Sequence, residues 1–124
     1  MLKFNLLLWV LTKRLQSAVK HDPQCAEYIQ GKDLIFQIQA EDVKGRYFKV
    51  QNGEIKSHMG LTAAPRFTLM FKTARQGFAV LSAKDSVDSF LNALRTQELI
   101  ITGSFVDVVW FQNLVNFIQL KPKK

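Results

Sequence analysis

The chain has 124 residues, a single cysteine and a formal net charge of +7. A chain of this length can bury a sizeable core, so we predict one domain over residues 1–124, and the lone Cys25 excludes an internal disulfide framework and a cysteine metal cluster. The surplus of Lys and Arg favours an anionic partner, whether lipid headgroups, a phosphorylated group or nucleic acid.

Residues 1–20 are predicted to form an amphipathic helix that docks on the domain. The docking stripe consists of Phe4, Leu8, Leu11, Leu15, Ala18 and Val19. Roughly opposite this stripe lie apolar residues inside a basic rim, namely Leu6, Trp9 and Val10 among Lys3, Lys13 and Lys20. Such a face is typical of a helix that touches an anionic membrane or a partner protein. The alternative is that other helices of the domain cover Leu6 and Trp9.

The middle of the chain alternates apolar and polar residues, as half-buried strands do. Strands are predicted at residues 34–40, 46–51, 55–59 and 66–72. Asn52-Gly53 is a strong signal for a type I′ turn that joins the second and third strands. In the fourth strand, Phe67, Leu69 and Phe71 are expected to face inward.

After the fourth strand the apolar residues follow helical spacing. Thr73 and Gln76 can form a capping box for a short helix, and Asp85 or Ser86 can cap a second one.

A short strand, Leu99 to Thr102, then ends at Gly103 and precedes a helix from Ser104 onward. This last helix is apolar around more than half of its circumference, so it needs cover on several sides. Asp107 and several amides interrupt it too often for a membrane span, which places it in a core or against a bound apolar ligand. The element order predicts an α+β fold with a largely antiparallel sheet and helices on one face.

The sequence contains no residue pattern typical of catalysis or metal binding. His21 and His58 are isolated from any Cys, Asp or Glu pattern, and the glycines form no phosphate-binding motif. We therefore predict no catalytic residue, no metal and no cofactor.

Basic residues are concentrated between Lys44 and Arg75, where seven of them face the single acid Glu54. They are expected either to form a docking surface for anionic lipid or a phosphorylated carrier group, or to be a solvated face that protects edge strands. Nucleic acid fits less well, because Tyr47 is the one aromatic residue evidently interleaved with these cations.

The segment from Arg66 to Val115 resembles the second half of the sterol carrier protein 2 (SCP-2) family of lipid-binding domains. GKDLIFQIQ and FKVQNGEI upstream fit the first half, so the resemblance covers residues 31–118. At the late strand the family commonly has Gly-Lys-Leu-x-Ile-x-Gly-Asp. Leu99, Ile101 and Gly103 agree with that pattern here, and Gln97, Glu98 and Ser104 depart from it.

The resemblance implies a non-enzymatic domain with a roughly five-stranded sheet and helices packed on one face around an apolar cavity. The cavity of such domains accepts fatty acids, acyl-CoA, phospholipids or sterols, and some bacterial relatives are accessory proteins of ubiquinone synthesis that hold polyprenyl intermediates. The basic tail, residues 121–124, lacks the peroxisomal tripeptide of many eukaryotic members. The chain therefore looks like a small bacterial, cytoplasmic member that contacts membranes peripherally.

Ten residues are predicted to line or flank the ligand cavity: Phe67, Leu69, Phe71, Phe78, Phe90, Leu94, Trp110, Phe111, Leu114 and Ile118. Contact with a membrane or partner is assigned to Leu6, Trp9, Val10 and Lys13. The alternative function is an interaction module with a filled core, whose first helix forms a homodimer or recruits an enzyme.

Overall fold

The protein is described by a computed structural model over residues 2–81 and 86–118. In chain order its elements are α1 (Leu2–His21), α2 (Pro23–Ile29), β1 (Leu34–Ala40), β2 (Val43–Gln51), β3 (Glu54–Met59), β4 (Phe67–Phe71), α3 (Ala74–Leu81), α4 (Ser86–Arg95), β5 (Leu99–Gly103) and α5 (Phe105–Val115). The predicted cap at Asp85 and the predicted tail at residues 121–124 lie outside the described residues.

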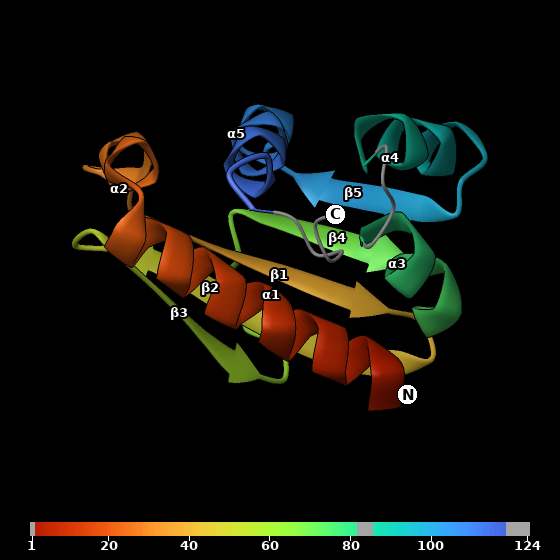
Figure 1. The fold of residues 1–124 in the computed structure, drawn as a ribbon. Helices are drawn as coiled ribbons and strands as arrows, with labels where there is room; N and C mark the ends of the chain where they lie inside the picture. The colour runs from red at the N-terminus through yellow and green to blue at the C-terminus, as the bar shows by residue number, and fades with distance from the viewer. Residues whose placement is uncertain (1, 82–85, 119–124) are drawn as a thin grey trace.

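The five strands form one sheet in the order β3-β2-β1-β4-β5, with the helices packed on one of its faces (Figure 1). Neighbouring strands pair antiparallel except for β1 and β4, which are parallel. The predicted α+β fold with a mostly antiparallel sheet is therefore confirmed.

The parallel pair arises because the chain returns from the edge strand β3 to the middle of the sheet through the loop at residues 60–66. This loop is anchored by Gln37, whose Oε1 accepts a hydrogen bond of 2.9 Å from the backbone N–H of Thr62. Gln37 alternates with Phe36 and Ile38, which face the helices, so the loop crosses the opposite face of the sheet.

The strand boundaries differ from the predicted ones by one residue at most, except at the start of β2. β2 begins at Val43, three residues earlier than expected, because Gly45 lets the strand approach β1 so closely that a Cβ there would overlap the Ile38 carbonyl. Pro23 is the first residue of α2, where its missing N–H costs nothing, and the Asp22 side chain accepts the N–H of Gln24.

Local turn signals proved accurate. Asn52 and Gly53 have φ angles of 56° and 73°, as a type I′ turn requires. The first half of the predicted capping box at α3 is confirmed, since the Thr73 hydroxyl accepts the backbone N–H of Gln76 at 3.1 Å. The side-chain oxygen of Gln76 accepts from the same hydroxyl at 3.2 Å.

The last helix, α5, covers β4 with one face only. Val108, Phe111 and Leu114 are buried against the core, whereas Phe105, Val106 and Val109 are exposed. Trp110 stacks on Tyr28 of α2, so α5 is covered by the sheet and by α2 and is open on the side of Phe105, Val106 and Val109. None of the described helices combines the length and the apolar character needed to cross a membrane.

Candidate functional site

Four aromatic rings fill the space between the sheet and α5. Phe36 on β1 stacks on Phe48 of β2 at 4.9 Å between ring centroids and on Phe67 of β4 at 5.0 Å. The ring of Phe111 lies over this stack, 4.8 Å from Phe36 and 6.1 Å from Phe67. The rings align because the three strand residues are direct partners in neighbouring strands. We call this group the Phe36 cluster.

All ten predicted ligand residues lie in or against the layer between the sheet and the helices. Six are buried, namely Phe67, Leu69, Phe71, Phe90, Phe111 and Leu114, and four are partly buried against the same core, namely Phe78, Leu94, Trp110 and Ile118. Burial alone does not distinguish a lining residue from an ordinary core residue, so the assignment stays a prediction. In the Phe36 cluster, a ligand beneath α5 would have to displace rings that contact one another.

A polar cluster fixes the first turn of α5. The side chain of Asp107 is 8% exposed, and its carboxylate lies 3.2 Å from the ammonium of Lys32 through Oδ1 and 3.2 Å from the guanidinium of Arg66 through Oδ2. The N–H of Asp107 is also hydrogen-bonded to the hydroxyl of the N-cap residue Ser104. Sequence reasoning treated Asp107 as a mere interruption of an apolar helix and did not single out Lys32.

The polar cluster keeps Asp107 ionised. Burial by itself raises the pKa of this carboxyl, but hydrogen bonds from Ser104 and Lys32 and the positive charges of Lys32 and Arg66 outweigh burial. The net result is a pKa below the ordinary value of 3.8.

A second set of contacts ties α5 to α2. The hydroxyl of Tyr28 donates to the carbonyl of Trp110 at 2.9 Å, and the two rings stack with centroids 5.8 Å apart. The ring centroid of Phe117 lies 5.5 Å from that of Tyr28, and the ammonium of Lys32 lies 5.1 Å from the centroid of the Trp110 ring. The amino-terminal half of the chain thus holds α5 over the Phe36 cluster.

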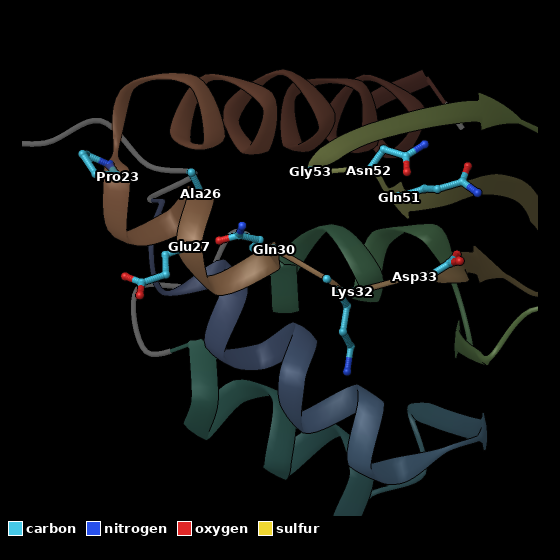
Figure 2. Close-up of a pocket in the computed structure, with 10 residues that line it drawn as sticks. Pro23, Ala26, Glu27, Gln30, Lys32, Asp33, Gln51, Asn52 and Gly53 are labelled. Atoms are coloured by element: carbon cyan, nitrogen blue, oxygen red, sulfur yellow. The ribbon is translucent and has the colours of Figure 1, made fainter.

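An open groove lies between α2 and the turn that joins β2 and β3 (Figure 2). It has a volume of about 1000 Å³, and its lining residues are Pro23, Ala26, Glu27, Gln30, Gly31, Lys32, Asp33, Gln51, Asn52 and Gly53. A smaller hollow of about 310 Å³ separates the end of α1 from β3. Neither is lined by any of the ten predicted ligand residues. Six of the ten lining residues are polar or charged, and through Lys32 the groove borders on the cluster at Asp107.

The outer face of α1 is uncovered. Leu6 and Trp9 are 56% and 48% exposed, so the interpretation that other helices cover them is wrong for the described residues. Val10 is half-buried beside them, and the ammonium of Lys13 lies 5.6 Å from the Trp9 ring. Residues 2–21 contain no Asp or Glu, so every charged side chain of α1 is basic.

The basic residues between Lys44 and Arg75 do not form one surface. Lys49 and Lys56 stand directly opposite each other on β2 and β3, on the face away from the helices. Arg46 instead donates to the hydroxyl of Ser57, and Arg66 is turned toward Asp107. In residues 2–81 and 86–118, no three His, Cys, Asp or Glu side chains are placed to hold a metal ion.

No protein-family model and no curated protein matches the sequence. Among solved structures, one described as a UbiJ-SCP2 ubiquinone synthesis protein matches with a TM-score of 0.64 and 12% identity, covering 90% of this chain and 94% of that one. Sterol Carrier Protein 2 from Yarrowia lipolytica matches with a TM-score of 0.59 and 12% identity, covering 89% and 90% of the two chains. Sterol Carrier Protein 2 Like 2 from Aedes aegypti matches with a TM-score of 0.54 and 15% identity, covering 91% and 97%.

The same architecture also occurs inside a larger enzyme. The sec-alkylsulfatase Pisa1 from Pseudomonas matches 80% of this chain with a TM-score of 0.56 and 12% identity, but the match covers only 15% of the sulfatase. The matches to free-standing domains extend over about nine tenths of both chains. Over the residues that the structure describes, this chain has the fold of the sterol carrier protein 2 domains.

Proposed function

We propose that this protein binds a long-chain apolar ligand between the sheet and its helices, without catalysing a reaction on it. The supporting observation is that the ten predicted ligand residues, which come from β4, α3, α4, α5 and the residue Ile118, meet in one layer. The ligand class is fatty acid, acyl-CoA, phospholipid, a sterol-like molecule or a polyprenyl chain, and the ligand enters by displacing α5 from the Phe36 cluster.

The free-energy cost of moving α5 is comparable to the gain from burying a long acyl chain. Exposing the three buried side chains Val108, Phe111 and Leu114 costs roughly 1.5–3 kcal/mol each, about 5–9 kcal/mol together. A chain of about 14 methylenes gains roughly 11 kcal/mol when it leaves water. Uptake can therefore offset the opening of α5, whereas a chain of about half that length gains roughly 6 kcal/mol and offsets only the low end of that cost.

We also propose that α1 brings the protein to an anionic membrane from the cytoplasmic side. Leu6 and Trp9 would enter the headgroup boundary, and Lys13 with the other basic residues of α1 would contact anionic lipid. Peripheral docking of this kind places the ligand layer near a donor membrane.

An accessory role in isoprenoid quinone synthesis is the second candidate. Two observations favour it: the similarity to a structure described as a ubiquinone synthesis protein, and the way aromatic side chains fill the layer. In that case the core stays closed and the exposed face of α1 dimerises or recruits an enzyme.

Mass spectrometry of the gently purified protein, first native and then after organic extraction, tests the main proposal. A stoichiometric lipid is expected, and the folded double variant Trp110→Gln/Phe111→Gln should lose it. Retention of the lipid in that variant would refute the placement. An empty wild-type protein whose Trp fluorescence ignores fatty acids, phospholipids and quinones would favour the accessory role. Light scattering of Leu6→Ser/Trp9→Ser then shows whether α1 holds a dimer.

A further inference from the structure

The polar cluster at α5 is one negative charge short of neutrality. Lys32 and Arg66 bring two positive charges to a single carboxylate, that of Asp107, each at 3.2 Å. No other acidic side chain among the described residues forms an ion pair with either cation. The cluster therefore carries a net charge of +1, held on two cations that solvent reaches.

Apolar groups adjoin this charge directly. Asp107 lies one helical turn before Phe111 on the same face of α5, and Arg66 immediately precedes Phe67 at the start of β4. Both phenylalanines belong to the Phe36 cluster. A positive site within one turn of an apolar layer matches the two parts of an anionic amphiphile, its charged headgroup and its chain.

Solvent reaches the cluster through its cations rather than its carboxylate. The side chains of Arg66 and Lys32 are 54% and 32% exposed, against 8% for Asp107. One Arg66 nitrogen, Nη1, contacts Asp107, which leaves further guanidinium donors for another acceptor. Asp107 thus acts as a positioning residue that holds both cations at the rim of the layer.

The groove in Figure 2 is not itself the anion site. Glu27 and Asp33 line it together with the single cation Lys32, so its net charge is negative. An anion is favoured on the Arg66 side of the cluster, at the start of β4.

We propose that Lys32 and Arg66 bind the anionic headgroup, a carboxylate or a phosphate, of an amphiphile whose chain lies beneath α5. This inference rests on the proposed function, because it assigns the polar end of the same ligand. It makes anionic amphiphiles the preferred ligand class over neutral ones of equal chain length.

The test compares palmitic acid, hexadecyl phosphate and the uncharged methyl palmitate in titrations that follow Trp fluorescence. Wild-type protein is expected to bind the two anions at least about tenfold more tightly than the ester. One moderately screened charge contact of roughly 1.4 kcal/mol gives this difference in affinity. Arg66→Gln should bring this ratio close to one.

Two further variants guard against misfolding and general charge effects. Arg66→Lys keeps the charge and should retain most of the preference for anions. Lys72→Gln removes an exposed cation just beyond the opposite end of β4 and should leave the ratio at the wild-type value. A ratio that is unchanged in folded Arg66→Gln, or that falls equally in Lys72→Gln, would overturn the proposal.

The remaining outcomes separate this inference from the function on which it rests. If wild type binds the ester and the anions equally well, the proposed headgroup site is wrong and the proposed site for the acyl chain beneath α5 stands. If wild type binds none of the three, both are wrong. Inorganic phosphate alone should raise the melting temperature far less than hexadecyl phosphate, and an equal rise would assign the cluster to a free anion and overturn the headgroup site.

Discussion

Truncating Phe111 to alanine separates the structural role of this residue from its place in a ligand site. The side chain is 2% exposed, and its ring contacts both Phe36 and Phe67. Removal of such a ring costs roughly 3–5 kcal/mol, which includes the cavity that it leaves. For a domain of this size that loss lowers the melting temperature by roughly 10–20 °C.

The same truncation is expected to strengthen ligand binding. A chain that enters beneath α5 no longer has to displace the ring, so part of the opening cost disappears. The melting temperature of Phe111→Ala should therefore rise more with saturating palmitic acid than that of wild type. A ligand present at about 100 times its dissociation constant contributes roughly 2.7 kcal/mol, which recovers more than half of the loss.

Leu15→Ala is the matched control. Leu15 is equally buried but belongs to α1 and is not among the predicted ligand residues, and its truncation costs roughly 2–5 kcal/mol. Differential scanning fluorimetry should show the wild-type ligand shift in this variant. Equal ligand shifts in the two variants would refute a chain site beneath α5, and an undiminished stability of Phe111→Ala would refute the packing of the ring itself.

Three other changes test separate parts of the structure. Asp107→Asn should cost about 1–3 kcal/mol at pH 7, and urea titrations should show the difference from wild type vanish in acid. The pKa of Asp107 is lower in the folded protein than its ordinary value of 3.8. The ionised carboxylate therefore contributes fully to the stability above pH 3.8, and this contribution disappears as pH falls through the folded pKa. A constant stability difference from pH 7 to pH 2 would contradict this. Gly103→Ala should lower the melting temperature more than Gly53→Ala. Both glycines have positive φ, but only at Gly103 would an added Cβ meet backbone atoms. Equal losses in the two variants would contradict this. Leu6→Ser/Trp9→Ser should weaken sedimentation with anionic vesicles about tenfold while the melting temperature stays within a few degrees of wild type; unchanged sedimentation would refute membrane docking by α1.

The strands were predictable because the signals that define them are local. Alternation in β4 correctly placed Phe67, Leu69 and Phe71 on the buried face, and Asn52-Gly53 fixed the hairpin. The parallel pairing of β1 with β4 has no local signal. Periodicity reports which face of a strand is buried but not which strand lies beside it.

The apolar candidate residues were predictable as parts of one core layer, whereas their role in holding a ligand stays a prediction. The predicted residues are apolar groups at regular spacing, and the structure brings them into one layer. The ion cluster was missed because the partners of Asp107 lie 75 and 41 residues away along the chain, at Lys32 and Arg66. No spacing rule links positions so distant, and an acid in an apolar helix looks like an interruption until its partners are known.

Asp107 also explains the orientation of α5. A helix that is apolar all round gains nearly the same burial energy in several rotations, so hydrophobicity alone does not select the face that meets the sheet. Turning Phe105 and Val106 inward would carry Asp107 away from Lys32 and Arg66 and leave those cations without their carboxylate. The ion cluster thus selects the rotation that places Phe111 over the Phe36 cluster. Because the apolar contacts select the rotation only weakly, α5 can shift when a ligand replaces its contacts. The acyl chain then packs against the Phe36 cluster, and the headgroup pairs with Lys32 and Arg66.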